Sequence, residues 1–342
     1  MIWQTWRQHR AEASVAAFIL VVVSAVMVAV GNAARSRAHL LGLPGCLSSH
    51  GDCSNALEQM HQHFHTIPPI TGSLIAVPLL AGMFWAAPLV SREYEAGTHR
   101  LAWTQSVAPL RWITTKLILI FSVLALAALV LGILAAWTLS PLSPAFGGRY
   151  NSTLYDIQGV VPVACMLFAL ALGVATSALI RRTIPAMAVT LVGYAAARIP
   201  VHFFRAHLAP FARYSATVPV RALTDRPGGS PQSLGAATLP PGAWVNSVSI
   251  TDSAGHSIAT GGGNLGLLLH FCPDAKPDSA GNIHVTSACQ RVLDSSTVHE
   301  TVLYHPSSHF WLLQAVESTL FLGLAAVLVT VAVLVVTGRH PV

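Results

Sequence analysis

Six apolar segments, each long enough to cross a bilayer as a helix, constrain this chain more than any other feature. A hydrocarbon core of roughly 30 Å requires about 20 residues of α-helix. The candidate segments are residues 13–30, 69–90, 113–139, 159–180, 184–204 and 310–337. Hydrophobic residues make up 53% of the 342 and charged residues only 9%, which excludes an ordinary soluble domain. The sequence therefore predicts an all-α integral membrane protein with six transmembrane helices.

The Lys and Arg residues that flank these segments predict the orientation of the chain. One side carries Arg7, Arg10, Arg92, Arg100, Arg111, Lys116, Arg181, Arg182 and Arg339, and the other carries Arg35, Arg37 and Arg149. Because the positive side faces the cytoplasm, we expect a multi-pass protein of the plasma membrane with both termini cytoplasmic. No Ala-x-Ala site follows the first segment, so we expect a first transmembrane helix and not a cleaved signal peptide.

This orientation places residues 31–68 and 205–308 outside the cell. The predicted domains are residues 1–204 with five helices, an external domain at 205–308, and a last helix with its tail at 309–342. Four of the five cysteines fall in the two external segments, which predicts local disulfides Cys46–Cys53 and Cys272–Cys289 in an oxidising compartment. The alternative is four reduced thiols.

The long external segment has the composition of a small disulfide-stapled domain between helices five and six. Residues 226–242 are rich in Gly, Pro and Ser and are expected to be irregular. Residues 244–250 and 283–287 carry β-branched side chains at strand-like spacing.

One cytoplasmic loop, residues 91–116, carries charges of both signs in a chain that otherwise has few. Gly97 can release a helical turn, and Leu101, Trp103 and Val107 lie among Arg100 and Arg111. This pattern suits a short amphipathic helix on the membrane surface. The alternative is an ordinary loop that follows the positive-inside rule.

The order of residues in this loop resembles a known family. Ala-Pro-Leu at the end of an apolar segment is followed by Ser-Arg-Glu-Tyr-Glu-Ala-Gly-Thr, then Leu-Ala-Trp-Thr-Gln-Ser, then Arg-Trp before the next segment. This run is similar to the first cytoplasmic loop of ABC exporter permeases of the type V or ABC-2 class. The start of the last helix, from His309 to Glu317, resembles actinobacterial-type permeases of that class.

The resemblance implies a coupling helix that docks on a separate ATPase. The residues that would make this contact are Arg92, Glu93, Glu95, Gly97, Thr98 and Arg100. It further implies two copies of that ATPase, which would bind ATP and magnesium, and a second permease copy that forms a homodimer. The cargo would be a hydrophobic or amphipathic small molecule such as a drug, an antibiotic or a lipid-like compound, as in multidrug efflux.

Motifs for catalysis are missing from the sequence. It contains no Walker A, H-E-x-x-H, G-x-S-x-G or G-x-G-x-x-G pattern. We therefore expect no enzymatic activity and no cofactor in this chain. The net charge of +6 lies in the flanks of the apolar segments, so no nucleic-acid surface is expected. The alternative function is a membrane sensor or assembly module whose external domain binds a ligand or a metal.

Charged residues inside the apolar segments mark a second candidate site. Arg198 lies in the outer part of the fifth segment, with His202 and Arg205 on the same helical face. Glu317 lies at similar depth in the last segment. Because a charge at this depth needs a partner or water, Arg198 and Glu317 could form a pair or line the transport pathway. Arg198 could instead extend its side chain to the outer interface.

Three histidines, His61, His63 and His65, are the nearest approach to a metal site. On a helix, His61 and His65 would share a face at a spacing that can chelate a divalent ion. Because no carboxylate or thiolate completes a closed set, we assign no metal to them.

Overall fold

The structure is a computed structural model that describes residues 2–49, 52–95, 109–224, 239–240, 242–252, 255–258, 264–273 and 286–338. The chain divides into two compact units. Met1–Leu208 and Trp311–Val342 form the first, here called the helical unit, and Ala209–Phe310 form the second, called the sheet unit. The predicted external domain begins at Arg205, whereas the sheet unit begins at Ala209. Residues 205–208 belong to the helical unit instead.

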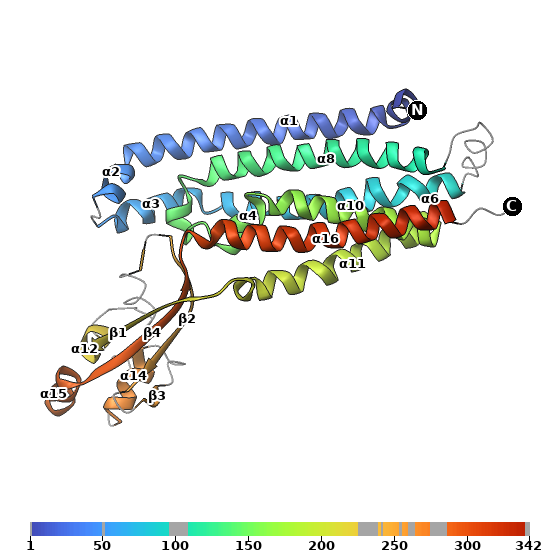
Figure 1. The fold of residues 1–342 in the computed structure, drawn as a ribbon. Helices are drawn as coiled ribbons and strands as arrows, with labels where there is room; N and C mark the ends of the chain where they lie inside the picture. Colours follow the sequence, from blue (N-terminus) through green and yellow to red (C-terminus); the bar gives the residue numbers. More distant parts are fainter. Residues whose placement is uncertain are drawn as a thin grey trace. The chain divides into compact units, whose positions relative to one another are not determined.

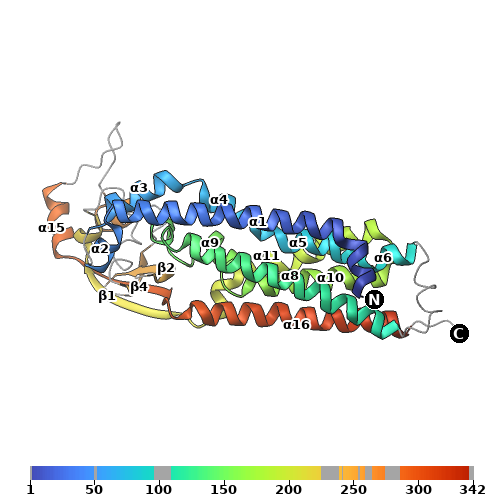
Figure 2. The same cartoon turned by 90° about the horizontal axis from the view of Figure 1, so that it is seen from above.

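The described residues contain six helices long and apolar enough to span a membrane. The spans are Ser14–Leu40, Ile67–Glu95, Ile113–Leu139, Val161–Ile180, Thr183–Leu208 and His309–Gly338. Five of the spans lie in α1 (Ile2–Leu40), α8 (Pro109–Leu139), α10 (Val161–Ile180), α11 (Thr183–Phe204) with η4 (Arg205–Leu208), and α16 (His309–Gly338). The start of α1 and the end of α16 lie at the same end of the helical unit as the end of α6 (Ala87–Glu95), as Figure 1 and Figure 2 show.

The first helix is longer than predicted. It was expected to end near residue 30, but α1 continues to Leu40 because no proline interrupts residues 31–40, and Gly42 follows with a φ of 64°. Arg35 therefore lies on the helix, where its guanidinium stacks 3.7 Å from the ring centroid of Trp137 in α8. Two short helices follow, α2 (Leu43–Ser48) and α3 (Ser54–Phe64), and the Cys46–Cys53 disulfide joins α2 to the start of α3.

The second span is broken into short pieces. It consists of α4 (Ile67–Gly72), the 3-10 helix η1 (Ser73–Ala76), α5 (Val77–Ala81), the π-helix η2 (Gly82–Ala86) and α6. Pro68, Pro69, Pro78 and Pro88 explain the irregularity, because each proline lacks the backbone donor that a regular helix requires.

At the centre of the helical unit, α10 packs against η2, α6, α8 and α11. Its close approach to the second span depends on two glycines. A Cβ on Gly173 would lie 2.5 Å from the carbonyl oxygen of Gly82, and a Cβ on Gly82 would lie 2.6 Å from that of Ala169. Small residues of this kind let transmembrane helices approach closely.

The sheet unit corrects the prediction of an all-α chain. Its strands are β1 (Ala212–Pro219), β2 (Trp244–Thr251), β3 (Ser257–Ile258) and β4 (Thr297–His305), in the antiparallel order β1-β4-β2-β3. Its helices are α12 (Val220–Thr224), α14 (Asn264–Phe271) and α15 (Ser287–Ser295). The predicted strand at 244–250 matches β2. The prediction of a strand at 283–287 is wrong for Thr286 and Ser287, because Thr286 is the N-cap of α15 and Ser287 is its first residue. Residues 283–285 lie outside the described residues.

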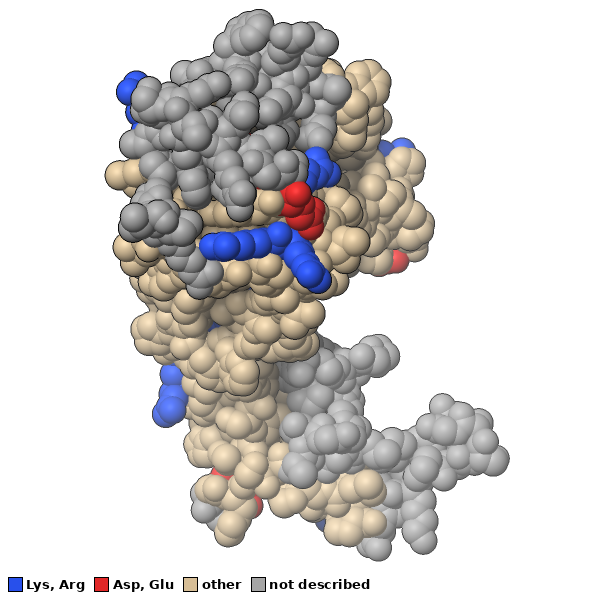
Figure 3. Space-filling model, turned by 90° about the vertical axis from the view of Figure 1, so that its right-hand side faces the viewer, with Lys and Arg blue, Asp and Glu red and all other residues tan. Residues whose placement is uncertain are grey.

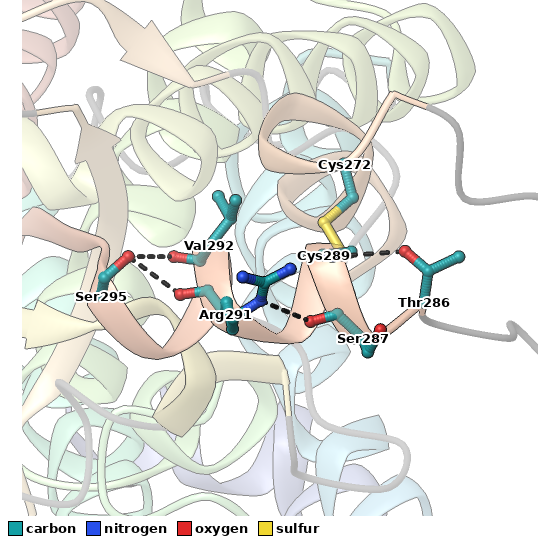
Figure 4. The surroundings of a disulfide bond; sticks show 7 residues. All are labelled: Cys272, Thr286, Ser287, Cys289, Arg291, Val292 and Ser295. Carbon is teal, nitrogen blue, oxygen red and sulfur yellow. Dashed lines mark hydrogen bonds between the residues drawn. A yellow bond between two sulfur atoms is a disulfide. The ribbon is translucent and has the colours of Figure 1, made fainter.

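A small apolar core and one disulfide hold the sheet unit together. Val220, Ile250, Leu267 and Val298 are fully buried between the sheet and its helices. The Cys272–Cys289 disulfide joins the residue after α14 to the first turns of α15, where the Thr286 hydroxyl accepts a hydrogen bond from the backbone N–H of Cys289 (Figure 4). Most of the predicted irregular region, 226–242, lies outside the described residues.

Candidate functional site

Five ionisable side chains meet inside the helical unit and form what we call the charge cluster. Its members are Asp156, Arg198, His202, Arg205 and Glu317. The spacing of Arg198, His202 and Arg205 places them on one face of α11 and its 3-10 extension. Glu317 comes from α16, and Asp156 comes from α9 (Ser152–Ile157), a short helix in the connection from α8 to α10.

The side chain of Asn151 starts α9 and so sets the position of Asp156. Its Oδ1 accepts hydrogen bonds from the backbone N–H groups of Thr153 (3.1 Å) and Leu154 (3.4 Å), as a helix N-cap does. The one-turn helix that follows buries Leu154, Tyr155 and Asp156 within the bundle.

Each arginine of the cluster lies between the two carboxylates. Arg198 forms an ion pair with Glu317 Oε1, and its Nη2 lies 2.7 Å from Asp156 Oδ1. Arg205 forms an ion pair with Asp156, and its Nε lies 3.4 Å from Glu317 Oε2. His202 donates from Nδ1 to Asp156 Oδ2 at 2.9 Å.

The two arginines and the two carboxylates of the cluster are buried and balance in charge. Asp156, Arg205 and Glu317 are 3% or less exposed and Arg198 is 9% exposed, so two positive and two negative charges meet inside the helical unit. Burial alone would raise the pKa of Asp156, but the His202 hydrogen bond and the charges of Arg198 and Arg205 together hold that pKa below its usual value. The carboxylate of Asp156 is therefore ionised at neutral pH.

A cavity of about 30 Å³ borders the cluster. Asp156 and Arg198 line it together with Cys165 of α10 and Tyr194 of α11. Its remaining walls are mainly apolar residues of η1, α5 and α8.

One residue of α16 that sequence reasoning missed holds the connection from α9 to α10 in place. Gln314 is fully buried; its Oε1 accepts from the backbone N–H groups of Val160 and Val161 at 3.1 Å, and its Nε2 donates to the Tyr155 carbonyl at 3.3 Å. Gly159 allows this contact, since a Cβ there would lie 2.7 Å from Gln314 Oε1.

The structure brings Arg198, His202, Arg205 and Glu317, which the sequence singled out, together and adds Asp156 to them. The guanidinium of Arg198 lies between the carboxylates, not extended to an interface. Asp156 was missed because it falls in a short connection that looked merely external. The sequence does contain a signal for Asp156. Asn151 is a good N-cap residue and an apolar Leu-Tyr pair follows it, which together predict a helical turn with one buried face.

At the opposite end of α11, side chains of α6 contact three other helices. We call this set of contacts the α6 base. Glu93 forms an ion pair with Lys116 of α8. The carboxylate of Glu95 accepts from both the backbone N–H and the hydroxyl of Thr183, each at 2.9 Å, and so caps α11.

A buried serine completes the α6 base. The backbone N–H of Ser91 donates to Ser177 Oγ of α10 at 2.7 Å, and the hydroxyls of Ser91 and Thr183 are 2.9 Å apart. Figure 3 looks onto this end of the helical unit, where basic and acidic side chains lie next to one another on the described surface.

Two acidic residues that were predicted to contact a partner ATPase also have contacts within the chain. Glu93 and Glu95 bond to Lys116 and Thr183, because the ends of α8 and α11 lie beside the end of α6. Their contact with a partner stays a prediction. Arg92 is exposed. Gly97, Thr98 and Arg100 lie in the connection from α6 to α8, residues 96–108, which is outside the described residues.

The two histidines at the end of α3, His61 and His63, and the C-cap residue His65 each have a local contact. His61 stacks on Phe146 with ring centroids 4.8 Å apart, His63 packs against Phe64, and His65 bonds through Nδ1 to the Gln62 carbonyl at 2.8 Å. Within the described ranges, no group of three His, Cys, Asp or Glu side chains is placed to hold a metal ion.

Comparison with known proteins identifies the family. A family model described as ABC-2 membrane transporter related matches residues 17–205, from within α1 to the start of η4. No significant match was found among curated proteins or among solved structures. The matched region covers more than half of the chain and includes the α6 base as well as Asp156, Arg198 and Arg205 of the charge cluster. The chain therefore belongs to the ABC-2 membrane transporter related family and is a multi-pass membrane permease.

Proposed function

We propose that this permease is the membrane subunit of an ATP-driven exporter of the type V class, of the actinobacterial type. It works as a homodimer with two copies of a separate ATPase, which binds ATP and magnesium. The cargo is a hydrophobic or amphipathic small molecule, such as a drug, an antibiotic or a lipid-like compound. Both termini and the connection from α6 to α8 face the cytoplasm, and the sheet unit lies outside the plasma membrane.

The α6 base carries this proposal. An exporter must pass the closure of its ATPase to the transmembrane helices, which requires a lever tied to several of them at once. Glu93 ties α6 to α8, Glu95 ties it to α11, and Ser91 ties it to α10. A partner that displaces the connection from α6 to α8 would therefore move these helices together.

A single helix links the α6 base to the charge cluster. Thr183, which Glu95 caps, is the first residue of α11, and Arg198 lies about 22 Å further along the helix axis at 1.5 Å per residue. A tilt of α11 that starts at Thr183 would thus separate Arg198 from Glu317 of α16. This separation is the step that we propose opens the far end of the bundle.

Association with the ATPase tests the proposal. The chain would be expressed in its native host with a tag on the permease, and the proteins that co-purify with it would be identified by mass spectrometry. The expected result is a stable complex that is lost in the double variant Arg100→Glu and Trp103→Ala. The same variant should leave the thermal unfolding of the permease unchanged. If no ATPase is retained by the wild type, the sensor or assembly function becomes the better account.

A further inference from the structure

Gln314 of α16 takes the place of a missing side-chain cap on α10. The N-cap residue of α10 is Val160, whose side chain has no hydrogen-bond acceptor, and the first N–H groups of a helix have no partner within that helix. Gln314 Oε1 accepts from the N–H groups of Val160 and Val161, each at 3.1 Å. The start of α10 is therefore capped by the side chain of a helix distant in sequence.

The same side chain holds the end of α9. Gln314 Nε2 donates to the Tyr155 carbonyl at 3.3 Å, and Tyr155 directly precedes Asp156 in the chain. Between the two contacts, Gly159 turns the backbone with a φ of 73°, and a Cβ there would lie 2.7 Å from Gln314 Oε1. One fully buried amide thus fixes the backbone on both sides of this turn, next to Asp156.

Gln314 also lies one helical turn from Glu317, on the same face of α16. The two carboxylates of the charge cluster therefore belong to elements that Gln314 joins, because Glu317 is part of α16 and Asp156 is part of α9. Both arginines come from α11 and its extension η4. The cluster is thus divided between a group of helices that carries both negative charges and a helix that carries both positive charges.

We propose that Gln314 is a positioning residue of the charge cluster, which keeps Asp156 and Glu317 together in one rigid body of α9, the start of α10 and α16. The inference rests on the proposed function and deepens its opening step. When α11 moves, both arginines leave both carboxylates together. Without Gln314, the short helix α9 would follow Arg205, which is paired with Asp156, and the movement of α11 would leave the cluster half closed.

A double-mutant cycle between Gln314 and Asp156 separates positioning from simple capping. Gln314→Met keeps the length of the side chain and removes its hydrogen bonds to α9 and α10. In full-length permease in detergent micelles, it should lower the unfolding temperature by roughly 5 °C, and by less than half as much in the Asp156→Asn background. The reason is that a misplaced Asp156 loses ion pairs that Asp156→Asn has already removed.

Thr138→Val is the matched control for this cycle. It removes another buried hydrogen bond between helices, from the Thr138 hydroxyl of α8 to the Met27 carbonyl of α1, and should cost the same in both backgrounds. A residue that only caps α10 would behave as Thr138 does. Equal losses for Gln314→Met in the two backgrounds would therefore overturn the proposal.

The pH dependence of the same loss is a second readout that capping alone would not change. The pKa of Asp156 is lowered in the folded chain, so its ion pairs contribute above the unfolded value and are lost as the pH falls through the folded value. The loss in Gln314→Met should shrink below about pH 4 in the wild-type background and stay constant in Asp156→Asn. A loss that is independent of pH in both backgrounds would contradict the proposal.

Distances between spin labels test the rigid body with Gln314 intact. Two label pairs share Leu312 of α16, one with Ser152 of α9 and one with Phe203 of α11; all three positions are exposed, and the free Cys165 is buried. Labelled permease is diluted with unlabelled chain in nanodiscs, so that each distance lies within one chain. The distances are measured in wild type and in a variant that neutralises the cluster.

The neutralised variant combines Asp156→Asn, Arg198→Met, Arg205→Met and Glu317→Gln, so no buried charge is left unpaired among these four positions. We expect the distance distribution between positions 203 and 312 to broaden, because α11 is no longer held by ion pairs. The distribution between positions 152 and 312 should stay as in wild type, because Gln314 still joins α9 to α16. Broadening of both distributions, or of neither, would overturn the proposal.

None of these measurements uses the ATPase, so their outcome is independent of the association experiment. A permease that retains its ATPase but shows equal losses in the mutant cycle would leave the transport function standing and remove only the role of Gln314.

Discussion

At the residue scale, the charge cluster is a set of side chains that depend on one another. Arg198 contacts both carboxylates, and so does Arg205. Burying each charged side chain costs desolvation free energy. The attraction to its oppositely charged partners offsets this cost only while all of these partners are present. Loss of one member therefore leaves a buried charge without compensation, whereas loss of an oppositely charged pair does not.

Replacement of Glu317 tests this dependence. Glu317→Gln should lower the free energy of unfolding by about 3 kcal/mol, because one positive charge stays buried and unpaired. The double variant Glu317→Gln and Arg198→Met leaves Arg205 paired with Asp156 and should be less destabilised than the single variant. Unfolding by heat or denaturant in detergent micelles measures both. A double variant that is the less stable of the two would contradict the account.

Asp156 should make stability depend on pH in the acidic range. Its pKa is lowered in the folded chain, so its contribution is present above the unfolded value of about 3.9 and is lost as the pH falls through the folded value. The difference in unfolding temperature between wild type and Asp156→Asn should be full at neutral pH and shrink below about pH 4. A difference that stays constant from pH 7 to pH 3 would show that the ionised carboxylate does not stabilise the fold.

At the scale of elements, the contact between α10 and the broken second span is set by backbone and not by side-chain bulk. Gly173 lies against the Gly82 carbonyl, and Ser177, one helical turn further, accepts a hydrogen bond from Ser91. The small residues Gly173 and Ser177 indicate such a surface in the sequence. Its partner is harder to foresee, because the prolines of the second span decide where its backbone is exposed.

Gly173→Ala should destabilise the helical unit. The added Cβ would lie 2.5 Å from the Gly82 oxygen and 2.8 Å from the Cβ of Ala86, so the helices must separate, at a cost of about 1–3 kcal/mol. Gly323→Ala in α16 is the matched control, since no atom lies within 4 Å of its added Cβ. Thermal unfolding of both variants is the measurement. Equal stability of the two would mean that the close approach is absent.

The ion pair at the α6 base can be tested by exchange of its charges. Glu93→Lys should weaken ATPase association and helix packing together, because the new lysine faces Lys116. The double variant Glu93→Lys and Lys116→Glu restores an ion pair and should recover both properties. If the exchange recovers the unfolding temperature but not association, Glu93 contacts the partner directly as the sequence first suggested.

The sequence predicts the spans well, because membrane helices need long apolar segments and little else does. It predicts the sheet unit poorly. The sequence of β4, Thr-Val-His-Glu-Thr-Val-Leu-Tyr-His, mixes charged and aromatic side chains, although buried and exposed residues alternate at most of its positions. Its partner strand β1 lies more than seventy residues away in the chain. A strand pairing over that distance has no local signal in the sequence.

Some residues of the candidate sites can be predicted from the sequence and others cannot. Intramembrane Arg198 and Glu317 stand out because charge at that depth is rare. Asp156 and Gln314 do not, because each acts through a contact with a helix distant in sequence. Glu93 and Glu95 have the residue types of a partner surface, and only the packing of α8 and α11 beside α6 shows that they are engaged within the chain.

At the scale of the whole molecule, the proposed mechanism follows one mechanical path. In it, the ATPase would bind the connection from α6 to α8, the α6 base would pass the movement to α8, α10 and α11, and α11 would carry it to the charge cluster. The central claim of the proposal is that the ATPase binds at this connection, at the end of the helical unit that we propose faces the cytoplasm.

Site-specific cross-linking tests that claim most directly. Benzoyl-phenylalanine would replace Trp103 in the connection, or Leu47 of α2 as a control, in permease co-expressed with its ATPase; Leu47 is exposed and belongs to the segment expected outside the cell. The account predicts a light-dependent adduct between permease and ATPase from position 103 and none from position 47. An adduct from position 47, or none from position 103 in a complex that still co-purifies, would contradict it.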